Sequence, residues 1–173
     1  MSFLDRHCYI LRKTSCIIKP EADTSMKQGQ LIKVVEKLIT ICRDSEKAYK
    51  SAAEHIKQEH LKNLFLELSA QRSTFIKELE AELSTLGQVA ETDSGSVAAA
   101  MRITWMDLEA NTGGGDGAVL GSVERGEDIA KEAYADALGH ALPLRLDTII
   151  RRQAESVVNA HDTVKSMRDS LAA

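Results

Sequence analysis

The sequence has few of the residues that interrupt helices or favour sheets, with only 2 prolines and 4% aromatic residues in 173. Sheets rely on aromatic and β-branched side chains, whereas this chain is well supplied with Ala, Leu, Ile, Glu, Lys and Gln, most of which favour helices. We therefore expect an all-α protein. Its apolar content of 43% is enough to build the core of one ordinary domain.

Long apolar runs and clustered basic residues are also missing. Runs such as residues 97–101 are far shorter than the roughly 20 residues that cross a bilayer, and Asp5 and Arg6 interrupt any secretory signal pattern. The net charge of −4 gives no general attraction to phosphate backbones, and no stretch combines Lys/Arg clusters with aromatic residues. We expect a cytoplasmic protein with neither a nucleic acid nor a membrane as its partner.

Cysteine is scarce as well. The three cysteines, Cys8, Cys16 and Cys42, are an odd number without CxxC spacing. This pattern indicates neither a disulfide framework nor a zinc knuckle.

Apolar residues recur every three or four positions over four long segments, which predicts four core-facing helices. The expected spans are about 28–57, 60–86, 118–138 and 144–171. Gly87 is placed to end the second helix, and residues 139–143 are a strong stop signal for the third. Because the connection within each pair is short, we expect two antiparallel helical hairpins in a four-helix bundle.

A long crossover is expected to join the two hairpins. It contains polar residues 88–96, an extra short helix at about 97–110 and the glycine-rich break at 112–117. Met101, Trp105 and Met106 on that helix are either a contact surface for a partner or packing across the outside of the bundle. Residues 1–26 lack sustained periodicity and are expected to form an extension, which leaves 27–173 as the bundle domain.

One polar residue of each predicted helix falls on or near the core-facing line. These residues are Glu46, Gln71, Glu127 and Gln153. A slide of 81 residues superposes the two glutamates, and a slide of 82 superposes the two glutamines, which indicates duplication of a hairpin. Because all four lie at similar distances from the turns, we expect one polar layer across the core, with Tyr49 and Tyr134 beside it.

Two carboxylates buried in one layer need compensation. Iron or manganese bound by Glu46 and Glu127, with His161 as a further ligand, is one source. A proton held by one carboxyl group is a second, and amide hydrogens of Gln71 and Gln153 in a metal-free network that fixes register are a third. The sequence leaves these three chemistries open.

The segments that carry a family resemblance are CRDSEKAYKSAAE at 42–54, LFLELSAQRSTFIKEL at 64–79 and VERGEDIAKEAYADAL at 123–138. They resemble an uncharacterised bacterial family of four-helix-bundle proteins in the ferritin-like superfamily, over about residues 27–171. The resemblance implies a ferritin-like fold and no established activity. Metal-binding members of that superfamily carry Glu-x-x-His on helices two and four, but here Glu67 is followed by Ala70 and Glu155 by Val158. A complete di-iron site is therefore not implied.

The sequence shows no nucleophile with a matched base and orienting acid, so enzyme function is the less favoured interpretation. We expect a non-catalytic structural or interaction protein with a stress-related role, without a cofactor, that associates with itself or with another helical protein. The alternative is a metal-binding ferritin-like protein that holds iron or manganese at Glu46 and Glu127.

Overall fold

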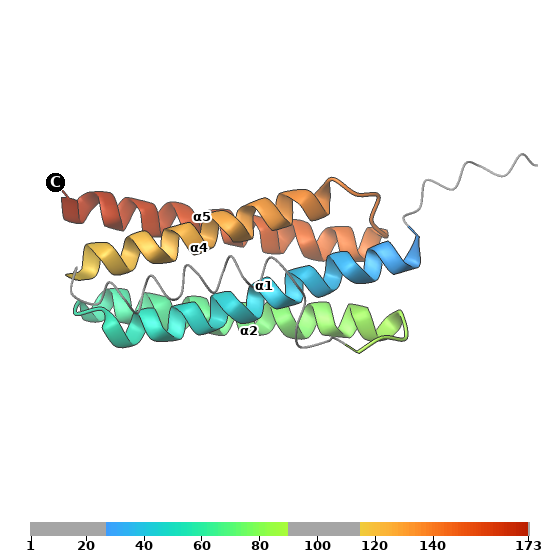
Figure 1. Cartoon of the computed structure of the whole chain (residues 1–173), viewed down its shortest axis with the longest axis horizontal. Helices are drawn as coiled ribbons and strands as arrows, with labels where there is room; N and C mark the ends of the chain where they lie inside the picture. Colours follow the sequence, from blue (N-terminus) through green and yellow to red (C-terminus); the bar gives the residue numbers. More distant parts are fainter. Residues whose placement is uncertain (1–26, 90–114, 173) are drawn as a thin grey trace, which may run out of the picture.

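The computed structural model describes residues 27–89 and 115–172. Within these ranges the chain forms four helices and no strands (Figure 1). The helices are α1 (Gln28–His55), α2 (Glu59–Thr85), α4 (Gly115–Leu138) and α5 (Leu144–Ala172). The prediction of an all-helical chain with four long helices is thus confirmed for the described residues. Within them, no helix has both the length and the apolar character needed to span a bilayer.

Several predicted features fall outside the described residues. The N-terminal extension at 1–26 is one of them. The short crossover helix at 97–110 is another, together with Met101, Trp105 and Met106. These features remain sequence-based predictions.

The four helices lie side by side along a common long axis (Figure 1). The Gln28 side chain donates to the Leu86 carbonyl at 3.2 Å, so the start of α1 lies beside the end of α2. Lys37 Nζ lies 2.8 Å from Asp136 Oδ2, which places the end of α4 at the same end of the molecule. Figure 1 shows α1 and α5 running in one direction and α2 and α4 in the other. Packing is closest within the pairs α1–α2 and α4–α5, and between the hairpins α1 and α4 pack more closely than α2 and α5.

The helix ends follow local sequence signals. Gly87 adopts a φ of 76°, and its N–H donates to the Ser84 carbonyl at 3.0 Å while the N–H of Gln88 donates to the Leu83 carbonyl at 3.3 Å. This is a glycine-terminated helix end, as predicted for the second helix. At the start of α5, the N–H of Asp147 donates to the Pro143 carbonyl at 2.9 Å.

The start of α4 differs from the sequence prediction. Residues 112–117 were expected to break the chain and the helix to begin near 118, but α4 begins at Gly115. The Asp116 carboxylate explains the difference, because it accepts hydrogen bonds from the backbone N–H groups of Lys57 at 2.9 Å and Gln58 at 3.2 Å. These bonds anchor the first turn of α4 to the α1–α2 turn and satisfy donors at the start of α2.

The buried apolar residues form two clusters, one towards each end of the bundle. The cluster towards the α4–α5 turn includes Leu38, Leu79 and Ile150. The cluster towards the α1–α2 turn includes Phe65, Leu120 and Val164. Between them lie buried polar side chains, among them Arg72 and Glu127.

Many buried positions of the two hairpins coincide at a spacing of 81 residues. In α1 and α4 the buried pairs include Leu38/Val119, Cys42/Val123, Tyr49/Ala130 and Ala53/Tyr134. In α2 and α5 they include Phe65/Leu146, Arg72/Gln153, Ile76/Val157 and Leu83/Val164. At this spacing Gln153 pairs with Arg72. The slide of 82 residues, which pairs Gln153 with Gln71, stays a prediction.

The contacts of Asp116 can be tested by mutation. Replacing Asp116 with Ala removes the acceptor of two backbone N–H groups, so we expect the free energy of unfolding to fall by about 1–2 kcal/mol. Urea denaturation followed by circular dichroism measures this change. The matched control is Glu132→Ala, an exposed acidic residue of the same helix. Equal stability of both variants would show that the Asp116 contacts do not support the fold.

Candidate functional site

The centre of the bundle is a buried ion pair between α2 and α4. Arg72 Nη2 donates to Glu127 Oε2 at 2.7 Å, and the two side chains are only 1% and 2% exposed. Such a pair loses solvation from both ions, so it is stable only when good geometry and further hydrogen bonds compensate. Its position makes it the main polar feature of the core.

Three neighbouring side chains surround the Arg72 guanidinium. Arg72 Nη1 donates to Gln71 Oε1 at 3.1 Å. The centroids of the Tyr49 and Phe75 rings lie 5.8 and 5.4 Å from the guanidinium carbon. Both distances are within the range of cation–π attraction. The guanidinium is thus held by a carboxylate, an amide and two aromatic rings.

Electrostatics keep the Arg72 guanidinium charged. Burial by itself lowers the pKa of Arg72, but the Glu127 carboxylate more than offsets this effect and the pKa lies above its ordinary value. The pKa of Tyr49 is raised well above 10.0, first by burial and then by the charge of Glu127. The phenol of Tyr49 therefore stays protonated beside the ion pair.

A second group of hydrogen-bonded polar side chains extends from the core towards the surface. It joins residues of α1, α4, α5 and α2. The Tyr134 hydroxyl donates to Gln153 Oε1 at 2.8 Å, and Gln153 Nε2 donates to Glu78 Oε2 at 2.8 Å. Cys42 Sγ lies 3.2 Å from the Tyr134 oxygen. Because the single hydroxyl hydrogen of Tyr134 points to Gln153, the Cys42 thiol is the donor in this contact.

Cys42 is a poor nucleophile in this setting. Burial raises the pKa of its thiol to about 11, although the hydrogen bond with Tyr134 and the charge of Arg72 act in the opposite direction. Since the thiolate is the reactive form, the thiol is unreactive near neutral pH. The arrangement therefore favours a structural role for Cys42.

The structure brings together part of the predicted polar layer. Glu127 and Gln153 are buried, Gln71 is half-buried beside Arg72, and Tyr49 and Tyr134 are each 1% exposed. These residues belong to the two connected polar groups described above. The layer is thus partly assembled as predicted, but it is organised around Arg72, which the sequence analysis did not select.

Two predicted metal ligands lie elsewhere. The Glu46 side chain is 22% exposed and its Oε1 accepts from Lys50 Nζ at 2.6 Å, one helical turn away. His161 is buried, and its ring nitrogens contact Asp128 Oδ1 at 3.0 Å and Asp162 Oδ1 at 2.8 Å. Each of these two side chains therefore has its own charged neighbours, separate from the Arg72–Glu127 pair.

The donor set does not fit a di-metal centre. Within residues 27–89 and 115–172 there is no group of three or more His, Cys, Asp or Glu side chains that could hold a metal ion. The positive charge beside Glu127 comes from Arg72. The arrangement can hold charge and fix side-chain positions, and no step of metal chemistry follows from it.

The spacing of the buried residues in α2 is a sequence signal that indicates Arg72 as a core position. The buried residues Phe65, Leu68, Arg72, Phe75 and Leu79 follow one another at intervals of three and four. This is the spacing of a core-facing stripe. The residue predicted from the sequence at the polar position of this stripe was Gln71, which lies one residue, or about 100°, to the side.

A comparison with protein families gives one match. A family model described as "Domain of unknown function (DUF2383)" matches residues 30–140, which is more than half of the chain. No match is found among curated proteins.

The Arg72–Glu127 pair can be tested with a double-mutant cycle. Arg72→Met leaves Glu127 as a buried carboxylate without its cation, and Glu127→Leu leaves the reverse, so each should lower the free energy of unfolding by about 3–5 kcal/mol. The double variant should lose much less than the sum, because neither charge is left alone. Urea denaturation of all four proteins measures the coupling. Additive losses would show that the two side chains do not stabilise each other.

Proposed function

The chain belongs to the DUF2383 family of domains of unknown function, and we propose that it is a non-catalytic, ferritin-like helical scaffold that acts through association. The observation that carries this proposal is that the central carboxylate, Glu127, is bound by the Arg72 guanidinium at 2.7 Å. In a metal-binding bundle of this type a metal ion would neutralise the core carboxylates. Here a side chain of the protein fulfils that role.

The ferritin-like part of the proposal is supported by the positions of the helix ends. The end of α2 lies beside Gln28, at one end of the bundle, through the contact of Leu86. The start of α4 lies at the other end, where Asp116 binds the α1–α2 turn. Since α2 ends and α4 begins at opposite ends of the bundle, the order of the described helices fits folds with one long crossover. We propose that the predicted short helix at 97–110 lies in this crossover.

The remaining predicted ligands also have protein partners. Glu46 is paired with Lys50, and His161 contacts Asp128 and Asp162. A metal ion at any of these positions would have to replace an existing ion pair or hydrogen bond. This competition favours the scaffold over the iron or manganese alternative.

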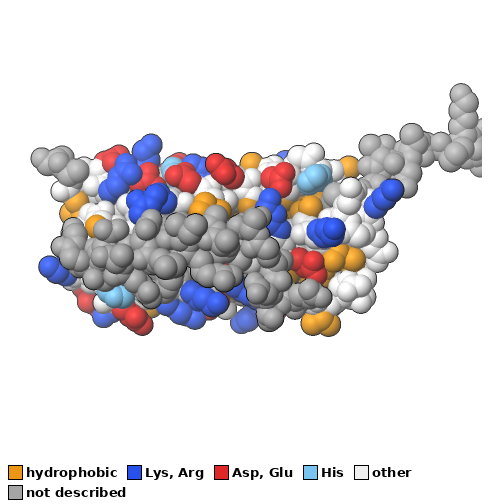
Figure 2. All heavy atoms as spheres, in the orientation of Figure 1, with side chains coloured by type: hydrophobic (Ala, Val, Ile, Leu, Met, Phe, Trp, Pro, Cys, Tyr) orange, Lys and Arg blue, Asp and Glu red, His pale blue; other side chains and the backbone are white. Residues whose placement is uncertain are grey.

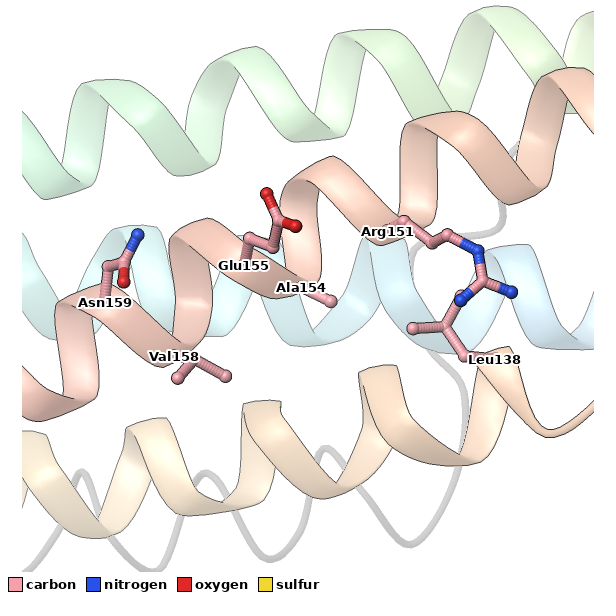
Figure 3. A pocket seen from close by; sticks show the side chains of 6 residues that line it. All are labelled: Leu138, Arg151, Ala154, Glu155, Val158 and Asn159. Carbon is pink, nitrogen blue, oxygen red and sulfur yellow. The ribbon is translucent and has the colours of Figure 1, made fainter.

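Association is supported by a groove on the outer side of α4 and α5. Leu138, Ala154 and Val158 line this groove of about 440 Å³ together with Arg151, Glu155 and Asn159. Figure 3 shows Leu138, Ala154 and Val158 directed towards the space between the two helices. Val158 is 42% exposed and therefore presents apolar surface to solvent at this groove.

A second copy of the chain suits the charges along this groove. Arg151 and Glu155 lie one helical turn apart at its border. When two copies of α5 pair in opposite directions about a two-fold axis near residue 153, Arg151 of each copy lies opposite Glu155 of the other. On the face of the bundle seen in Figure 2, positive and negative side chains of the described residues are likewise interspersed.

The metal alternative can be tested by elemental analysis. We expect wild-type protein, produced with added iron and manganese, to contain far less than one metal ion per chain, because Arg72 already neutralises Glu127. Glu46→Gln and the exposed control Glu132→Gln should give the same low content. Stoichiometric metal in the wild type that is lost in Glu46→Gln would contradict the scaffold proposal.

Self-association can be tested by light scattering after size-exclusion chromatography. The apparent mass of the wild type should rise above the 19.0 kDa of one chain as the concentration increases. Val158→Glu should remain near the monomer mass, because it places a charge in the apolar groove. Leu66→Glu on α2, which changes a residue of similar exposure at 46%, is the control and should behave as the wild type. A wild type that stays monomeric at all concentrations would exclude self-association.

A further inference from the structure

The α1 helix is covered on all sides over part of its length. Residues 34–46 include no exposed residue, and the five consecutive residues 38–42 are all buried. Five consecutive residues point in every direction around a helix, because each is turned about 100° from the one before. Among the described helices, α1 packs mainly against α2 and α4, which would leave its outer face exposed. The burial of a full turn therefore indicates a further cover on α1.

The α5 helix lies diagonally across the bundle from α1 and shows the opposite pattern. It also packs against α2 and α4. Over residues 144–171, however, every three consecutive residues of α5 include an exposed one. The outer face of α5 is thus open to solvent along the helix, and the outer face of α1 is not.

The ion pairs of α1 identify its outer face. Lys37 forms an ion pair with a residue of α4, and Arg43 forms one with a residue of α2. At about 100° per residue, Thr40 and Asp44 lie between these two directions, on the side away from the core. Thr40 is nevertheless only 6% exposed, and the Oδ2 atom of Asp44 is buried. The covered surface is therefore the outer face of α1 around Thr40 and Asp44.

Residues 90–114 connect α2 with α4 in the sequence, and the ends of these helices show where that connection starts and stops. The end of α2 lies beside Gln28 at the start of α1. The start of α4 lies beside Lys57, just after the end of α1. Since α2 and α4 are both neighbours of α1 and of α5, a connection along the bundle has one route over α1 and another over α5. The burial pattern favours the route over α1.

The predicted helix at 97–110 suits the covered surface in length and in apolar character. A helix of this span is about 21 Å long, and the stretch 34–46 of α1 is about 20 Å long. Met101, Trp105 and Leu108 recur at intervals of four and three residues, which gives the predicted helix an apolar face.

The charges are complementary as well. Residues 90–114 contain a single basic side chain, Arg102. Asp44 provides a carboxylate on the covered face of α1, with one of its oxygens buried. Burial of a carboxylate is unfavourable unless a cation or hydrogen-bond donors compensate, and an arginine supplies both.

We propose that the outer face of α1 around Thr40 and Asp44 is a docking surface for residues 97–110 of the same chain. The segment lies along α1 as a helix, with Met101, Trp105 and Leu108 towards the bundle and Arg102 beside Asp44. These apolar residues are then packed within the chain. The groove of α4 and α5 is left free for a second copy, and the docking does not depend on that association.

Trp105 is the only tryptophan of the chain, so its fluorescence tests this surface in the full-length protein. We expect wild-type emission at a shorter wavelength than that of free tryptophan, and weak quenching by acrylamide. Thr40→Arg places a long charged side chain under the segment, so the emission should shift to longer wavelength and the quenching should increase. Thr148→Arg is the matched control and should behave as the wild type. Like Thr40, Thr148 donates to the carbonyl four residues earlier, but it lies on the exposed face of α5.

Three results of this experiment would overturn the proposal. One is a wild type in which acrylamide quenches Trp105 as it quenches free tryptophan. Another is exposure of Trp105 by Thr148→Arg and not by Thr40→Arg, which would place the segment over α5. The third is wild-type emission that changes with protein concentration, which would show that a second copy covers this surface.

Charge reversal is a second test, and it does not require Thr40→Arg to fold. Arg102→Asp and Asp44→Arg should each increase the quenching of Trp105, because each places two like charges side by side. The double variant restores opposite charges and should regain the protection of the wild type. If the double variant is quenched as strongly as the single variants, Arg102 does not lie beside Asp44 and the proposed docking is wrong. Circular dichroism of each variant checks that the bundle remains folded.

Discussion

The ion pair between Arg72 and Glu127 is the interaction on which the arrangement of this bundle depends. It joins α2 of the first hairpin to α4 of the second at 2.7 Å, in a part of the core without solvent. Apolar contacts tolerate a helix that slides or turns slightly, whereas a buried guanidinium without its carboxylate is strongly unfavourable. The pair therefore fixes how the two hairpins pack against each other. The two apolar clusters lie on either side of it.

The same pair accounts for the character of the surrounding core. Gln71, Tyr49 and Phe75 provide the hydrogen bond and aromatic faces that a buried guanidinium requires. The chain of contacts from Cys42 through Tyr134 and Gln153 to Glu78 satisfies the next buried polar groups. Such networks define a single core arrangement more sharply than aliphatic packing alone, at the cost of taking polar groups out of water. The network therefore holds these buried side chains in fixed positions.

The polar layer predicted from the sequence contains Glu127 of the central ion pair, but it has Gln71 in place of the neighbouring Arg72. Glu127 and Gln153 were correctly placed in the interior, because each lies on the apolar stripe of its helix. Gln71 was selected because a slide of 82 residues superposes it on Gln153, whereas Arg72 lies on the buried stripe of its helix.

The sequence by itself determined the helices, since the recurrence of apolar residues and the stop signals at Gly87 and Pro143 act within one segment of chain. It also determined which helix faces turn inward. Only the tertiary structure decided the partners of the charged side chains, so that Glu127 meets Arg72 while Glu46 turns to Lys50. The physical reason is that Arg72 and Glu127 are 55 residues apart, and their contact depends on how two hairpins pack, which no local pattern encodes.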